Sequence, residues 1–165
     1  MADYHSPTVV QPVISGTDMT PLERLLRGLV FDTDEQDGGM YLHSWCGPSD
    51  VVTLPIGDLH AAWEAAPLNE NTCVGTHVAA LLAKHDAEAG DDPLGDIDID
   101  LTESGNGWDR MFQDIVRRSA TIDEIVVTTS FTCTKMRPDG FGGSVMLITA
   151  DAIRYRSTTE ILEEF

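Results

Sequence analysis

Basic residues are scarce in this sequence: ten Lys and Arg stand against 28 Asp and Glu, which gives a formal net charge of −18. Only two of the ten are lysines, Lys84 and Lys135. A surface this negative repels nucleic acid, anionic membranes and phosphorylated ligands, and it attracts basic proteins. We therefore expect a basic protein surface as the partner, and no direct contact with nucleic acid or with a membrane.

Cysteine is also scarce, because the chain has only Cys46, Cys73 and Cys133. A sparse set of odd number argues against a disulfide framework. No apolar run approaches the roughly 20 residues of a membrane span. Residues 1–16 lack the basic start and the continuous apolar stretch of a secretory signal. These absences predict a protein of the reducing cytoplasm.

The acidity is concentrated in the middle of the chain. Residues 32–104 carry 16 acidic residues and one basic residue, a net charge of −15. The flanking segments, 1–31 and 105–165, carry only −1 and −2. General solvation or adaptation to a salty cytoplasm would explain an acidic surface. The concentration in one segment keeps a specific binding role open beside these explanations.

Local signals predict an α+β fold. Thr20, Pro21 and Glu23 form the N-cap, first-turn proline and capping box of a helix. Further helices are expected at 57–67, 69–90, 108–120 and 157–165. Strands are expected at 40–45, 51–56, 96–101, 123–135 and 143–155, and at 8–15 as an edge strand, because Pro12 cannot donate to a ladder.

The expected architecture is one compact domain over residues 20–165, preceded by an extended N-terminal arm over 1–19. Its antiparallel sheet includes a C-terminal β-hairpin, and three to five helices pack against the sheet. The acidic segment 32–39 is expected to be a solvated turn. The strands at 40–45 and 51–56 are expected to follow one another across a turn.

A row of aspartates marks the expected strand at 96–101. Asp96, Asp98 and Asp100 alternate with isoleucines, so a strand would place the aspartates on its solvent face, roughly 6.7 Å apart. Such a row is either a solvated strand face or a surface that binds a basic partner. Asp91 and Asp92, in the acidic loop that precedes the strand, would extend the same surface.

The row does not match a calcium-binding loop. An EF-hand loop that begins at Asp96 requires glycine at its sixth position and glutamate at its twelfth. Leu101 and Gly107 occupy those positions. We therefore expect no metal and no cofactor at this strand.

A second pattern, "NTCVGTH", places Cys73 and His77 four residues apart on a helix. A thiol at a helix start, where the helix dipole lowers its pKa, resembles the arrangement of papain-like hydrolases, including the NlpC/P60-type enzymes. The resemblance implies a catalytic Cys73 with His77 or with His43 from the strand "YLHSW". A buried structural cysteine with ordinary histidines is the alternative. A zinc site is not expected, because no second Cys/His pair has ligand spacing.

The segment between the two C-terminal strands, "KMRPDGFGG", carries Lys135, Arg137 and Phe141. Two cations and an aromatic ring on an acidic protein suggest a contact site at a loop, where function often resides. A plain turn explains the Pro-Asp-Gly sequence equally well.

The sequence as a whole favours binding over catalysis. We expect an inhibitor or accessory factor that presents its acidic middle to a basic partner such as a nucleic-acid-processing enzyme. Antirestriction, anti-CRISPR and nuclease-immunity proteins that imitate DNA are similar in size and charge, which is an analogy without a shared motif. The alternatives are a cysteine hydrolase or transferase, and a virion or other structural subunit with an extended arm.

Overall fold

The main sheet has seven strands, in a computed structural model that describes residues 3–89, 95–102, 107–137 and 139–165. Six strands follow the order β3-β4-β2-β7-β8-β9, and β1 pairs with the far end of β7. All of these pairs are antiparallel. The strands are β1 (Tyr4–His5), β2 (Thr8–Ile14), β3 (Asp32–Gln36), β4 (Gly39–Ser44), β7 (Glu124–Cys133), β8 (Gly142–Thr149) and β9 (Ile153–Ser157).

Two further strands, β5 (Val51–Pro55) and β6 (Asp96–Asp100), form a separate antiparallel pair. The described residues also form five α-helices, which confirms the predicted α+β class and its single compact domain. The helices are α1 (Pro21–Val30), α2 (Ile56–Glu64), α3 (Cys73–Ala89), α4 (Trp108–Arg118) and α5 (Thr158–Glu163), with short 3-10 helices η1 (Gly16–Asp18) and η2 (Pro67–Asn71).

Helices α1 and α4 form the core together with the main sheet. The predicted capping box of α1 is confirmed: Thr20 Oγ1 accepts a hydrogen bond from the Glu23 N–H, and the Glu23 carboxylate accepts one from the Thr20 N–H. Helix α4 packs against β7 and β8, and its Phe112 and Ile115 are fully buried. The apolar spacing of both helices therefore matches the face that each one buries.

The prediction of an edge strand at 8–15 is wrong, because β2 lies between β4 and β7. The pairing of β2 explains how a central strand contains Pro12. Its pairs with β7 end at Gln11, and its register with β4 shifts between Val10 and Ile14. Pro12 thus lies at an irregularity where it donates no ladder hydrogen bond.

Three other strands differ from expectation. The acidic segment expected to be a turn is β3, and its turn to β4 consists of Asp37 and Gly38, which both have positive φ. Strand β5, expected to follow β4 across a turn, does not join the main sheet and pairs instead with β6. The expected strand at 143–155 is two strands, because the chain turns between Thr149 and Ala152, whose backbone groups are hydrogen-bonded.

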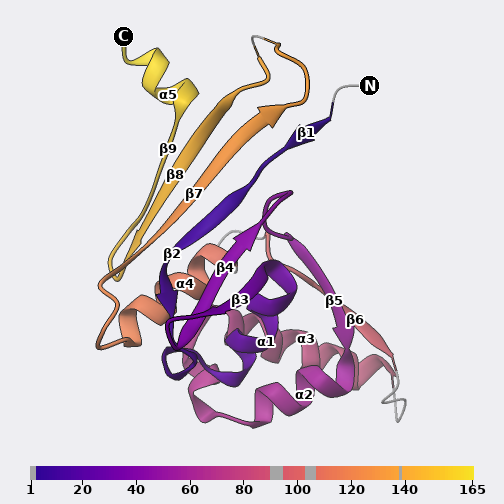
Figure 1. The fold of residues 1–165 in the computed structure, drawn as a ribbon. Coiled ribbons are helices and arrows are strands. Elements are labelled where there is room, and N and C mark those ends of the chain that lie inside the picture. Colours follow the sequence, from indigo (N-terminus) through magenta and orange to yellow (C-terminus); the bar gives the residue numbers. More distant parts are fainter. Residues whose placement is uncertain (1–2, 90–94, 103–106, 138) are drawn as a thin grey trace.

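The molecule has two visibly different halves (Figure 1). Helices α1 to α4 gather around one end of the main sheet, together with β5 and β6. Strands β7, β8 and β9 continue past these helices, and α5 lies at their far end. We call residues 8–122 the body and residues 124–165 the blade.

Candidate functional site

The aspartates of β6 form an exposed row on the surface of the body. Asp96, Asp98 and Asp100 are all exposed, as the alternation predicted. Ile99, between them, is completely buried, and Ile97 packs against the core. The three aspartates are paired, in the same order, with Pro55, Thr53 and Val51 on β5. We call the three aspartates the acidic row.

Threonines, and not cations, contact the acidic row. Thr53 Oγ1 donates to Asp98 at 2.6 Å, and the backbone N–H and Oγ1 of Thr102 donate to Asp100 at 2.8 and 2.6 Å. The two bonds from Thr102 lower the pKa of Asp100, with a smaller contribution from the charge of His77. In the described part of the chain, no Lys or Arg forms an ion pair with the row. Lys and Arg therefore leave the negative charge of the row unpaired in this part of the chain.

The arginines of α4 are directed at carboxylates inside the body. Arg118 lies 2.5 Å from the carboxylate of Glu23, whose side chain is completely buried. Arg117 lies 3.3 Å from Asp114, which is also buried, and donates a further bond to the backbone of Ala150. A buried carboxylate requires such a partner. These two cations therefore neutralise carboxylates of the interior and do not reach the acidic row.

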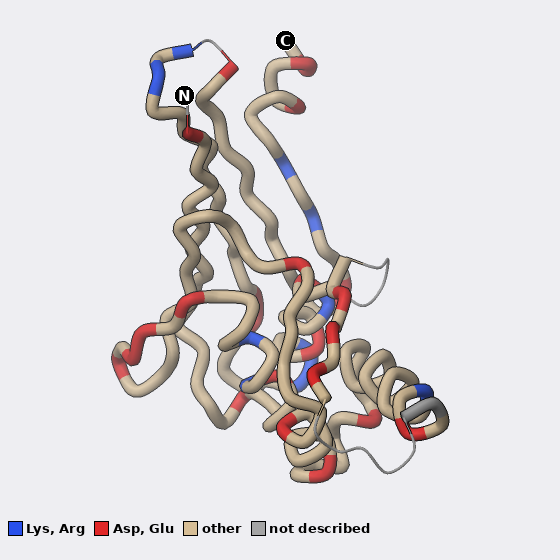
Figure 2. The backbone as a smooth tube through the Cα atoms, turned by 90° about the vertical axis from the view of Figure 1, so that its right-hand side faces the viewer, with Lys and Arg blue, Asp and Glu red and all other residues tan. Residues whose placement is uncertain are grey.

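The other eight Lys and Arg residues are divided equally between the body and the blade (Figure 2). Lys135 and Arg137 lie at the hairpin tip of the blade, and Arg154 and Arg156 lie on β9. In the acidic middle segment of the sequence, Lys84 on α3 is the only basic residue. The acidic excess thus lies in the body, in space as well as in sequence.

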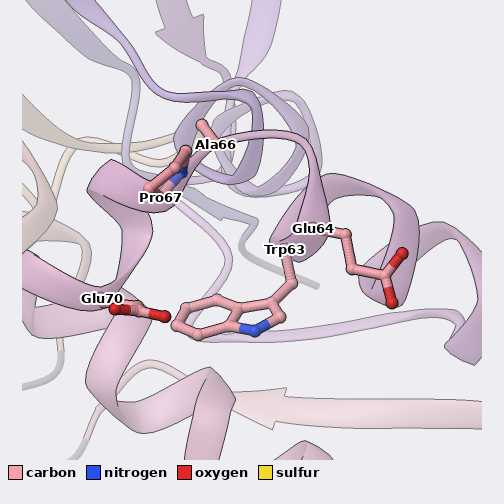
Figure 3. A pocket seen from close by; sticks show the side chains of 5 residues that line it. All are labelled: Trp63, Glu64, Ala66, Pro67 and Glu70. Carbon is pink, nitrogen blue, oxygen red and sulfur yellow. The ribbon is translucent and has the colours of Figure 1, made fainter.

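A cleft of about 290 Å³ lies between the end of α2 and η2 (Figure 3). Asn69 holds the two elements together, because its buried side-chain amide donates to the backbone carbonyls of Ala62 and Trp63 at 3.0 and 3.1 Å. The lining residues are Trp63, Glu64, Ala66, Pro67 and Glu70.

The cleft combines an aromatic ring with carboxylates. In Figure 3 the six-membered ring of Trp63 points toward Glu70, while the carboxylate of Glu64 points away from the ring. Trp63 is partly buried against the core, which holds its indole in place. An indole beside a carboxylate suits an ammonium or guanidinium group, through the ring's negative face and a charge-assisted hydrogen bond.

Cys73 begins α3, as the sequence predicted, but a carboxylate lies beside it. Its N–H donates to Asp114 at 2.6 Å, and its Sγ lies 3.8 Å from the other oxygen of the same carboxylate. Burial raises the pKa of the Cys73 thiol, Asp114 raises it further, and Arg117 and Arg110 oppose this more weakly. A nucleophilic cysteine requires the opposite shift.

The two histidines considered with Cys73 have other surroundings. His43 on β4 is 3.0 Å from Asp34 and stacks on Tyr41, in a hollow of about 410 Å³. Within the described part of the chain, no hydrogen bond joins His43 to Cys73. His77 on α3 lies near enough to β6 for its charge to lower the pKa of Asp100. The structure therefore gives His43 and Cys73 separate carboxylate partners.

The hairpin tip is a turn with exposed side chains. Lys135 and Arg137 are exposed, and Phe141 is 49 % exposed, so all three are available for contact. Asp91 and Asp92, expected to extend the acidic row, lie outside the described residues. The sequence did not single out Trp63 or Glu70, although an aromatic residue near two glutamates was a usable signal.

Neither a metal nor a membrane segment is indicated in the part of the chain that the structure describes. Its His, Cys, Asp and Glu side chains form no group of three that could hold a metal ion. None of its helices is both long and apolar enough to cross a bilayer. Comparison with known protein families, with curated proteins and with solved structures finds no match.

Proposed function

We propose that this protein is a binding protein whose acidic row docks on a basic protein surface. The observation that carries the proposal is the state of the row: three exposed carboxylates on one strand, with hydrogen bonds from threonines and no ion pair with Lys or Arg among the described residues. Like charges held side by side repel and destabilise the free protein. A basic partner relieves that repulsion on binding, and its approach is accelerated by the negative field.

The cleft at Trp63 is a second contact point in this proposal. One Arg or Lys side chain of the partner enters it, with its cation beside the indole and the carboxylate of Glu70. Desolvated cation–aromatic contacts are stronger than exposed ones, so the cleft supplies specificity that a flat acidic face lacks.

Nucleic-acid-processing enzymes are the partners that we favour, because their substrate channels are basic. A strand that holds carboxylates roughly 6.7 Å apart presents a regular line of charge, as a polyanion does. The protein would then compete with nucleic acid for the same channel. The proposal places this inhibitor or accessory factor in the cytoplasm, the compartment that its sparse cysteines favour.

The test measures affinity for a synthetic peptide rich in Arg and Lys, by calorimetry at several salt concentrations. The row variant carries Asp96→Asn, Asp98→Asn and Asp100→Asn. The control carries Asp123→Asn, Glu124→Gln and Asp151→Asn, which are exposed acids elsewhere. Both variants change the net charge from −18 to −15.

We expect the row variant to bind about tenfold more weakly and with a flatter salt dependence, while the control stays near the wild type. Equal losses in the two variants would show that only net charge matters, and that the row is a solvated face. Indole N–H signals of the three tryptophans report on the cleft separately. Binding is expected to shift the Trp63 signal and to leave the Trp108 signal in place.

A further inference from the structure

Helix α5 contacts β8 and β9, but its apolar side chains are exposed in the single chain. None of its six residues is buried. Its apolar residues Ile161 and Leu162 are 44 % and 71 % exposed, and Phe165, which follows the helix, is 98 % exposed. A capping box between Ser157 and Glu160 fixes its first turn. A helix of this length is unstable without tertiary packing. Its apolar side chains therefore lack the cover that such a helix needs.

A groove of about 330 Å³ lies next to α5, over the neighbouring strands of the blade. Val145 on β8 lies in its floor, paired with Thr128 on one side and Arg156 on the other. Ile161 of α5 forms one of its walls. The groove and the exposed helix are thus neighbours on the same surface.

Exposed large apolar side chains gather in the blade. Thirteen such side chains are exposed in the described chain, and eight of them lie within residues 131–165. Two of them, Val145 and Ile161, line the groove, where exposed apolar side chains favour contact with another protein. The eight residues are Phe131, Met136, Phe141, Val145, Tyr155, Ile161, Leu162 and Phe165.

The blade carries exposed charges of both signs close to its apolar side chains. Arg154 and Arg156 lie on β9, while Glu163 and Glu164 lie on α5 and after it. Arg156 already pairs with Glu164 within the chain, whereas Arg154 and Glu163 have no ion-pair partner among the described residues. A surface that carries both signs beside apolar residues fits a second copy of itself about a two-fold axis. A basic partner would meet repulsion from these arginines.

Pairing of two β9 edges in the register centred on Tyr155 is unfavourable. Two β9 strands that paired about Tyr155 would place Arg154 of one copy opposite Arg156 of the other. Like charges directly opposite each other destabilise a ladder, and charged residues protect exposed edges from pairing. The groove beside α5 is also lined by Arg156, but this arginine is already paired with Glu164.

We propose that the protein forms a two-fold dimer in which α5 of each copy lies in the groove of the other. Ile161 and Leu162 of one copy then cover Val145 of its partner copy. Arg154 of each copy faces Glu163 of the other. This contact uses the blade, so it is independent of the acidic row.

Sedimentation equilibrium of the full chain tests the dimer. We expect a dimer for the wild type and at least about a tenfold larger dissociation constant for Ile161→Glu with Leu162→Glu. The control Leu68→Glu changes an apolar residue of the body that is 56 % exposed, and it is expected to leave the dimer intact. A wild type that stays monomeric at all concentrations, or a dimer that survives both α5 substitutions, would overturn the proposal.

A charge exchange tests the geometry without touching apolar residues. In a dimer of Arg154→Glu, a glutamate at 154 faces Glu163 in both contacts, so like charges repel. In a dimer of Glu163→Arg, an arginine at 163 faces Arg154 in both contacts, with the same result. Each variant is expected to dimerise at least about tenfold more weakly than the wild type. A mixture of the two restores both pairs and therefore forms a heterodimer. Failure of the mixture to associate better than either variant would contradict the proposed contact.

Discussion

The body and the blade use their charged residues in opposite ways. In the body, Arg117 and Arg118 pair with the buried carboxylates of Asp114 and Glu23, and the exposed acidic row has no Lys or Arg as ion-pair partner among the described residues. In the blade, Arg154 and Arg156 are themselves exposed, close to exposed glutamates and apolar side chains. The body thus presents a large excess of acidic residues, whereas the blade presents both signs with apolar side chains.

This difference separates two kinds of association within one chain. Contact between an acidic face and a basic protein weakens as salt screens the attraction. Contact between two copies of a chain with net charge −18 gains from the same screening, because the long-range force between the copies is repulsive. The two proposed contacts are therefore expected to respond to salt in opposite directions.

The largest expected effect comes from removing a cation from the interior of the body. Arg118→Ala leaves the buried carboxylate of Glu23 without its cation. Breaking a buried ion pair in this way costs about 3 kcal/mol, because the remaining charge is not solvated. Denaturant unfolding followed by circular dichroism measures the loss.

The matched variant in the blade is Arg156→Ala, which removes the cation of an exposed ion pair with Glu164. Water replaces the lost partner, so the unfolding midpoint in dilute solution is expected to stay unchanged. Equal losses in Arg118→Ala and Arg156→Ala would refute the distinction between interior and surface arginines.

Local signals in the sequence were sufficient for the helices but not for the sheet. The capping box at Thr20 and Glu23 acts within one turn, so it was visible in the sequence. The central position of β2 depends on two strands far away in the sequence, and Pro12 gave a misleading signal. Strand β3 was missed because its side chains are polar on both faces, and its strand conformation depends on pairing with β4.

Among the candidate sites, too, some features follow from the local sequence and others depend on contacts between distant parts of the chain. Exposure of the acidic row follows from strict alternation, which the sequence displays directly. The cleft at Trp63 depends on where η2 lies against α2, and the buried side chain of Asn69 fixes that placement. The carboxylate beside Cys73 comes from Asp114, 41 residues further along the chain. Only the folded chain could reveal contacts of that range.

A smaller effect is expected at Cys73, where the interior of the body controls a thiol. Because burial and Asp114 raise its pKa, little thiolate exists at neutral pH. Iodoacetamide is expected to label the exposed Cys46 first and Cys73 slowly. Asp114→Asn removes a negative neighbour, lowers the Cys73 pKa and accelerates its labelling. Mass spectrometry of the labelled peptides measures both rates. Faster labelling of Cys73 than of Cys46 in the wild type would contradict this account and favour the hydrolase alternative.

The smallest expected effect concerns a single carboxyl group of the acidic row. Two hydrogen bonds from Thr102 lower the pKa of Asp100, so this side chain stays charged below the ordinary carboxyl value of about 3.9. Its small contribution to stability is complete above that ordinary value, and it is lost as pH falls through the lowered pKa. Thr102→Val removes the hydroxyl donor and keeps the backbone donor, so the pKa of Asp100 is expected to rise part of the way back. Carbon-detected NMR titration of the carboxyl group follows the change directly. A titration of Asp100 that is identical in the wild type and in Thr102→Val would show that the hydroxyl does not hold this charge, and that the row is less rigidly fixed than its hydrogen bonds imply.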